Sequence, residues 1–94
     1  MTEDAQPVTH NEAAHRFETR IEGHLARADY RMNDGVMHIF HTEVPVQFEG
    51  RGIAARVVHA AMAYARANGL KVYPACSYVR TFMARHTEYE DLRA

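Results

Sequence analysis

The chain has 94 residues, of which 47% are hydrophobic and 24% are charged, which is enough for one domain with a hydrophobic core. Its net charge of −1 with neutral histidines disfavours sequence-independent binding to nucleic acid, which needs a basic surface. No stretch approaches the ~18 apolar residues of a membrane-spanning helix, so we expect neither nucleic acid nor a membrane as a partner.

Cysteine and histidine usage bears on the compartment and on metals. Cys76 is the single cysteine, which excludes an intramolecular disulfide, and the first residues lack the charged start and apolar run of a signal peptide. We therefore expect a reducing, cytoplasmic location. The seven histidines form no pair at metal-ligand spacing on a predicted helix, so we expect no metal site.

The first part of the chain predicts an antiparallel sheet. Residues 1–12 are polar and are expected to be flexible, whereas 13–94 should form the single domain. Three segments then have the composition of strands, and turn sequences at Glu22-Gly23 and Asn33-Asp34-Gly35 separate them. The segments are Ala14–Ile21, Gly23–Met32 and Val36–Val44. Together they predict a three-stranded antiparallel meander.

Alternation along the third segment predicts which side chains share a face. One face should carry Met37, Ile39, His41 and Glu43. The opposite face should carry Val36, His38, Phe40, Thr42 and Val44. Pro45 should end regular pairing, because proline has no N–H to donate to a neighbouring strand.

The second half of the chain predicts a helix between two strands. A helical apolar period begins at Arg51 or Gly52 and ends at Asn68-Gly69. Leu70–Cys76 is a strand, which a right-handed crossover should place parallel to the third segment of the meander. Ser77 should cap a short second helix. Tyr89 and Leu92 should anchor the polar C-terminal tail.

The segment VPVQFEGRGIAARVV (residues 44–58) places two glycines at the mouth of the predicted helix. First-turn N–H groups lack helical partners and the helix dipole is positive there, so this junction can hold a phosphate group. Arg51 could add a charge-assisted hydrogen bond, while Glu49 should point away. The alternative is that Gly50 and Gly52 only make a turn. Ala55 stands where a dinucleotide-binding fingerprint needs its third glycine, and no P-loop motif is present.

The context of this loop resembles the GNAT superfamily of N-acetyltransferases, and most closely its small YjdJ-like and NATD1-like group. Four motifs carry the resemblance in order, between His41 and Leu92, and the meander before them fits in pattern only. They are His41-Thr42-Glu43-Val44, Gly50-Arg51-Gly52-Ile53, Pro74-Ala75-Cys76-Ser77-Tyr78-Val79 and His86-Thr87-Glu88-Tyr89-Glu90-Asp91-Leu92. In the last motif Thr87 takes the place of a proline.

The resemblance implies a mixed α+β fold of minimal GNAT type, with the antiparallel meander followed by a βαβ unit and a short C-terminal helix. It implies acetyl-CoA as co-substrate, with the pyrophosphate on the loop and the pantetheine arm in a splay between the two parallel strands. The implied CoA-binding residues are Val44, Val46, Gln47, Phe48, Glu49, Gly50, Arg51, Gly52 and Ile53.

Acetyl transfer needs a base for the amine, a polarised thioester and a proton for the leaving thiolate. Glu43 and His41 are the candidate bases, although each could be only a polar strand residue. Cys76 is a candidate acyl carrier, because a helix N-terminus stabilises a thiolate, or it is an inert small residue. Tyr78 is the favoured acid, with Tyr73 as the alternative.

The chain departs from larger GNAT domains, because only a turn separates its first two predicted strands and no helices can lie there. The amine acceptor site is therefore open, or a second copy of the chain or another partner completes it. Three functions remain in competition. They are an acetyl-CoA-dependent N-acyltransferase, a CoA-binding module without efficient turnover, and an interaction domain whose glycines only make a turn.

Overall fold

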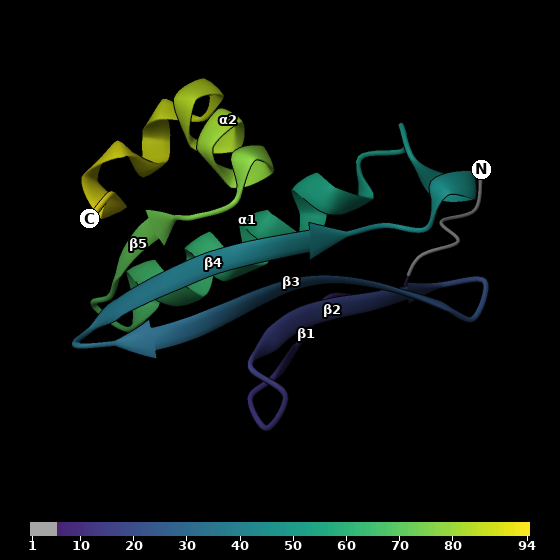
Figure 1. Cartoon of the computed structure of the whole chain (residues 1–94), viewed down its shortest axis with the longest axis horizontal. Helices are drawn as coiled ribbons and strands as arrows, with labels where there is room; N and C mark the ends of the chain where they lie inside the picture. Colours follow the sequence, from purple (N-terminus) through teal and green to yellow (C-terminus); the bar gives the residue numbers. More distant parts are fainter. Residues whose placement is uncertain (1–5) are drawn as a thin grey trace.

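The computed structural model describes residues 6–94 and shows one five-stranded sheet with helices against it (Figure 1). The strands are β1 (Thr9–Asn11), β2 (Arg16–Ile21), β3 (His24–Asn33), β4 (Val36–Glu43) and β5 (Lys71–Pro74). The helices are η1 (Val46–Phe48), α1 (Ile53–Ala67), α2 (Ser77–Arg85) and η2 (Thr87–Leu92). The strand order is β1-β2-β3-β4-β5, antiparallel throughout except for the parallel pair of β4 and β5.

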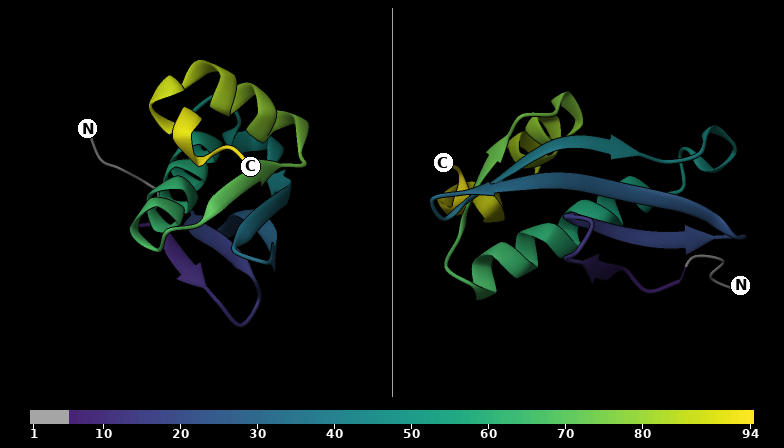
Figure 2. Two further views of the ribbon diagram at one scale, coloured as in Figure 1. Left: turned by 90° about the vertical axis from the view of Figure 1, so that its left-hand side faces the viewer. Right: turned by 60° about the horizontal axis from the view of Figure 1, so that its bottom comes forward.

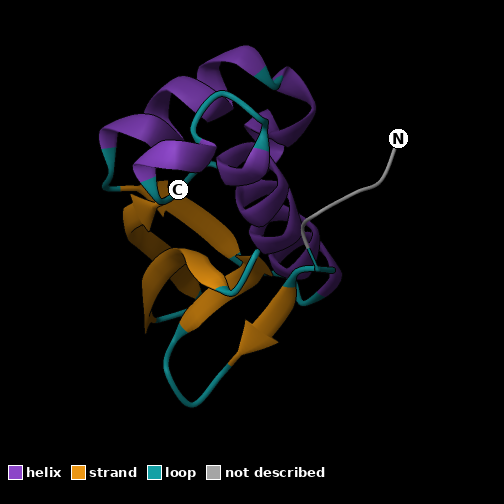
Figure 3. Ribbon diagram, turned by 90° about the vertical axis from the view of Figure 1, so that its right-hand side faces the viewer, coloured by secondary structure: helices purple, strands orange, loops and turns teal. Residues whose placement is uncertain are grey.

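Helices and sheet form two layers, with the helices together on one face of the sheet (Figures 2 and 3). Ala26 and Ala28 on β3 are completely or almost completely buried, and these small side chains let α1 approach the sheet closely. Phe82 of α2 contacts His59 of α1, so the two helices also pack against each other. No described helix covers the opposite face, which we call the open sheet face.

Most elements follow the sequence prediction. The meander is present, and the mixed α+β class and the parallel β4–β5 pair are confirmed. Asp34 and Gly35 both have positive φ in the two-residue turn between β3 and β4, as the hairpin sequence requires. Tyr89 is half-buried against the core and Leu92 is buried, so both tail anchors are confirmed.

Two predictions were wrong, one about the N-terminal segment and one about the start of α2. Within the segment expected to be flexible, Thr9–Asn11 forms β1 and pairs with β2, while residues 1–5 lie outside the described part of the chain. Val8 packs on the core beside this short strand, so tertiary contact overrides polar composition. Ser77 is the first residue of α2 rather than its cap, because Cys76 occupies the N-cap and no side chain caps it.

A bulge in β4 makes the predicted assignment of its side chains to the two faces of the sheet wrong. Asp29 of β3 pairs with His41, but the next residue Tyr30 pairs with Ile39, so Phe40 is an extra residue. The alternation therefore changes phase at Phe40. Met37 and Ile39 face the core, whereas His41 and Glu43 lie on the open sheet face with the partners Asp29 and Arg27.

The same bulge turns the side chains of Thr42 and Val44 toward the face of the sheet that the helices cover. Thr42 pairs with the buried Ala28 and so lies on the helix-covered face. Val44 follows it there and packs against a small cluster formed by Ile21, Ala26, Phe48 and Ile53. The residues that lead into the glycine loop are thus held against the N-terminal end of α1.

We expect Met62→Ala to lower the free energy of unfolding by about 2–5 kcal/mol, because this fully buried side chain fills the space between α1 and the sheet. Chemical denaturation measures the change. Met32→Ala is the matched control, because Met32 is 43% exposed and should cost less than about 1 kcal/mol. Equal losses in the two variants would contradict the assigned core.

Candidate functional site

Strands β4 and β5 part before β4 ends. Their pairing runs from Val36 with Lys71 to Ile39 with Pro74 and stops there. The Ile39 carbonyl accepts the N–H groups of both Ala75 and Cys76, at 3.0 and 3.1 Å. The chain then turns away into α2, so the last residues of β4 have no strand partner on that side within the described sheet.

A cavity of about 410 Å³ lies at this splay. It is bounded by the end of β4, the loop after it, the start of α1 and one side chain of α2. Its lining residues are Thr42, Glu43, Val44, Phe48, Glu49, Gly50, Gly52, Ile53, Ala54, Ala55 and Tyr78. The cavity therefore joins the strand splay to the helix mouth, the two places where the family resemblance implies that CoA binds.

The start of α1 presents unsatisfied donors to this cavity. The first helical hydrogen bond runs from the Arg56 N–H to the Gly52 carbonyl, at 3.1 Å. The preceding N–H groups of the first turn, at Ile53, Ala54 and Ala55, therefore have no helical carbonyl to bind. No side chain caps the helix and its first turn holds no acidic residue. These donors and the helix dipole favour an anion in the cavity.

The two glycines of the loop have a specific conformational role. Gly50 and Gly52 have φ values of 85° and 78°, in the left-handed region that other residues rarely adopt. A Cβ atom on either one would meet no protein atom within 4 Å. The glycines are thus needed for the backbone path of the loop, and the space beside them is open to a ligand.

The cavity gathers most of the predicted donor-site residues but not all. Val46, Gln47 and Arg51 do not line it, and Val46 is 77% exposed. The Arg51 guanidinium lies over the Phe48 ring, 5.2 Å from its centre. Glu49 is among the residues that line the cavity. A negative charge at this position disfavours an anion at the helix mouth.

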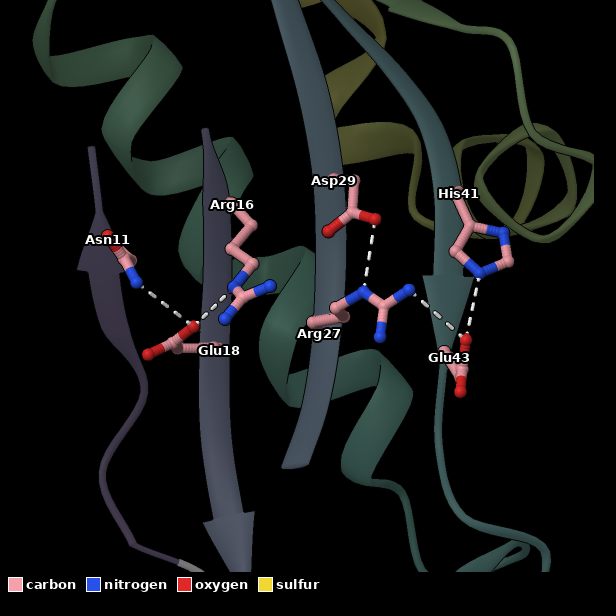
Figure 4. A network of polar contacts seen from close by, with 7 residues as sticks. All are labelled: Asn11, Arg16, Glu18, Arg27, Asp29, His41 and Glu43. Atoms are coloured by element: carbon pink, nitrogen blue, oxygen red, sulfur yellow. Dashed lines mark hydrogen bonds and ion pairs between the residues drawn. The ribbon is translucent and has the colours of Figure 1, made fainter. Parts of the chain in front are cut away.

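Glu43 and His41 form a pair on the open sheet face (Figure 4). The Glu43 Oε1 atom lies 3.1 Å from His41 Nε2 and 3.3 Å from a terminal nitrogen of Arg27. The hydrogen bond from His41 and the charge of Arg27 hold the pKa of Glu43 below its ordinary value. Glu43 is therefore a carboxylate at neutral pH that orients His41, and it is also among the residues that line the cavity at the splay.

Tyr78 and Cys76 lie on the other side of the splay, at the start of α2. Burial raises the pKa of Tyr78, with a smaller opposing effect of Arg85, so its hydroxyl remains a proton donor at neutral pH. Cys76 is half-buried, and its Sγ lies 3.7 Å from the hydroxyl oxygen of Thr42, which lines the cavity. Tyr73 instead stands on the open sheet face beside His38, away from the cavity lining.

The positions of three residues near the candidate site were not predicted from the sequence. Thr42 was placed on the wrong face, because the bulge at Phe40 leaves no mark in the alternation of residues. Arg27 and Asp29 were read only as strand residues, although they border the His41–Glu43 pair. Their neighbours are distant in sequence, and a register that includes the bulge is needed to find the contact.

Two further findings concern other kinds of site. Within residues 6–94, no three histidine, cysteine or acidic side chains are grouped so that they could hold a metal ion. No helix in that same part of the chain is long and apolar enough to cross a membrane.

Comparison with known proteins decides the family. The family model described as GCN5-related N-acetyl-transferase matches residues 16–92, which include the whole cavity lining. The chain belongs to the GCN5-related N-acetyltransferase family. Its meander from β2 onward, its glycine loop and its splayed parallel strands all lie within the matched residues.

Individual relatives agree with the family model. The protein NATD1 of Xenopus tropicalis is 32% identical over 80 residues, which cover 81% of this chain and 72% of that protein. Human NATD1 is 30% identical over 80 residues, with 81% and 70% covered. A GCN5-like protein from Staphylococcus aureus, solved by NMR in solution, is similar in fold with a TM-score of 0.74. It is 26% identical, and the similarity covers 93% of this chain and 86% of that one.

We expect the Glu43 carboxyl to titrate below the ordinary glutamate pKa of about 4.3 and to shift upward in His41→Ala, because the hydrogen bond from His41 is the main cause. Carbon-13 NMR of the carboxyl group during a pH titration measures this. Arg27→Gln should give a smaller upward shift.

The lowered pKa of Glu43 in the folded state determines how its contribution to stability changes with pH. Ionised Glu43 contributes to the free energy of unfolding at pH values above the ordinary glutamate pKa. This contribution is lost as the pH falls through the pKa that Glu43 has in the folded state. The difference in stability between the wild type and Glu43→Gln should therefore disappear on acidification. An unchanged Glu43 titration in His41→Ala would contradict the pair.

Proposed function

We propose that the protein is an acetyl-CoA-dependent N-acetyltransferase that acts on an amine. The observation that carries the proposal is the cavity of about 410 Å³ that connects an uncapped helix N-terminus to the splay of two parallel strands. Membership of the GCN5-related family supports the same donor. Acetyl-CoA has a pyrophosphate at one end and a thioester at the other, and the cavity offers a complementary feature for each.

The first-turn N–H groups of α1 would bind the pyrophosphate, and the glycine loop would let it approach the backbone. The unpaired side of β4 beyond Ile39 would bind the amides of the pantetheine arm, because its backbone groups have no strand partner there. The thioester would then lie near Thr42, between the His41–Glu43 pair and α2.

The chemistry is attack of the amine nitrogen on the thioester carbonyl carbon. A C–N bond forms, the C–S bond breaks, and the thiolate takes up a proton. His41, oriented by Glu43, is the candidate that accepts a proton from the ammonium form of the amine. Tyr78 is the candidate that donates a proton to the thiolate, and it regains one from the acetylated amine through solvent.

Cys76 defines an alternative route. Its thiolate would attack the thioester first and carry the acetyl group before the amine accepts it. The position of Cys76 beside Thr42 is compatible with this route as well as with a packing role. The two routes differ in whether Cys76 is needed for turnover.

A CoA-binding module without efficient turnover is the second candidate function. One observation favours it, namely that Glu43 is engaged by both Arg27 and His41 and has a lowered pKa, which weakens it as a direct base. Both functions predict affinity for acetyl-CoA. Steady release of free thiol in the presence of a panel of amines separates the enzyme from the module.

We expect Gly50→Asp to abolish binding of acetyl-CoA in titration calorimetry, while Gly50→Asn retains most of it. Both side chains meet the same left-handed backbone, which asparagine and aspartate tolerate better than other residues, so their difference reports the added charge alone. Glu49→Gln should strengthen binding, because it removes a negative charge from a residue that lines the cavity. Equal affinities of the Asp and Asn variants for acetyl-CoA would show that the pyrophosphate does not bind at this helix mouth.

We expect Tyr78→Phe to lower kcat by about 100-fold with little change in acetyl-CoA affinity, because general acid catalysis contributes about 10²–10⁴-fold. Steady-state kinetics with any accepted amine measure the effect. Cys76→Ala in the same assay decides between the routes, because unchanged turnover excludes a covalent acetyl-cysteine. A Tyr78→Phe enzyme with full kcat would exclude Tyr78 as the acid.

A further inference from the structure

A second cavity lies on the open sheet face, next to the His41–Glu43 pair. Its volume is about 260 Å³, and its lining includes Arg16, Arg27, Arg31, Asp29 and Phe40. Asp29 is the direct cross-strand partner of His41. The cavity therefore borders the cross-strand partner of the candidate base, on the face opposite to the helices, and His41 itself is not among its lining residues.

The charged groups of this cavity are not equivalent. Arg16 pairs with Glu18 at 2.6 Å, and Arg27 pairs with Asp29 at 3.0 Å and with Glu43 at 3.3 Å. Arg31 forms no ion pair within residues 6–94, and its guanidinium lies over the Phe40 ring, 4.7 Å from the centre.

An arginine that is stacked on an aromatic ring keeps its N–H edge available for a carboxylate or phosphate. Arg31 is thus a positioned cation in a cavity that three guanidinium groups and one carboxylate line.

Asp29 supplies the complementary charge. Its Oδ2 atom binds Arg27, whereas its Oδ1 atom is shielded from solvent and has no hydrogen-bond partner in the described chain. A carboxylate that is only half satisfied favours a cation nearby. An ammonium group between Asp29 and His41 would supply one, and it would lie where the amine must lose its proton.

We propose that the acceptor is an amine that also carries a carboxylate or phosphate group, with the anionic group on Arg31 and the amine beside Asp29 and His41. This proposal rests on the proposed function, because it names the acceptor class for the same transfer. Residues 29 and 31 are two apart on one strand, roughly 7 Å, which suits a small amino acid. The bulge at Phe40 contributes directly, because it places both the Phe40 ring and His41 on this face.

Binding can be tested without turnover by two-dimensional NMR of the full chain, following arginine Nε–H signals and the backbone amide of His41. The probes are β-alanine, propionate and propylamine, which share a carbon chain but differ in charged groups, and O-phosphorylethanolamine as the phosphate form. We expect β-alanine to bind best, propionate more weakly and propylamine least. Saturating CoA should leave the β-alanine affinity unchanged.

Arg31→Gln should weaken binding of β-alanine and propionate by about tenfold, as expected for loss of a charge-assisted hydrogen bond, and should leave propylamine unaffected. Arg93→Gln is the matched control, because it removes the same charge beside Glu90, far from the cavity lining, and should change none of the affinities. In the transfer assay, Arg31→Gln should abolish the preference for β-alanine over propylamine.

Three results would overturn the proposal: no shift at Arg31 and His41, equal affinities in Arg31→Gln and wild type, or displacement of β-alanine by CoA. Failure of the proposed function looks different. In that case acetyl-CoA releases no thiol with any amine, while β-alanine still binds and still depends on Arg31.

Discussion

The parting of β4 from β5 after Ile39 is the constraint on which the candidate site depends. One carbonyl, that of Ile39, accepts two N–H groups and ends the parallel pairing. Beyond this point the unpaired edge of β4 faces the start of α2, and the glycine loop returns the chain to the mouth of α1. The cavity between the parted strands thus connects a helix terminus that favours an anion to the candidate groups for proton transfer.

The bulge at Phe40 determines which side chains of β4 lie on each face of the sheet. Before the bulge, Met37 and Ile39 fill the core, and after it Thr42 and Val44 line the cavity at the splay. His41 and the Glu43 carboxylate are turned to the open sheet face, where Glu43 pairs with Arg27, and Glu43 is also among the residues that line the cavity at the splay. In the proposed function, the donor and the acceptor therefore approach from opposite faces of the sheet.

Local patterns predicted the regular elements well, because the hairpin sequence before Val36, the apolar period of α1 and the family motifs all depend on neighbouring residues. The remainder depends on contacts between distant residues. The extra residue Phe40 does not change the strand propensity of this segment, so its bulge could not be predicted. The alternation of residues therefore placed Thr42 on the wrong face of the sheet. The pairing of Arg27 with Glu43 needs the correct β3–β4 register, and the ordering of Thr9–Asn11 needs the core beside Val8. The predicted catalytic roles remain predictions.

The most direct test is an NMR titration of the labelled chain with acetyl-CoA, followed at the backbone amides. Binding at the splay predicts saturable shifts in two separate segments, Gly50–Ala55 at the helix mouth and Phe40–Val44 along the unpaired edge of β4, with one common dissociation constant. Shifts confined to one of these segments, or absent from both at millimolar acetyl-CoA, would contradict a donor site that spans the loop and the parted strands.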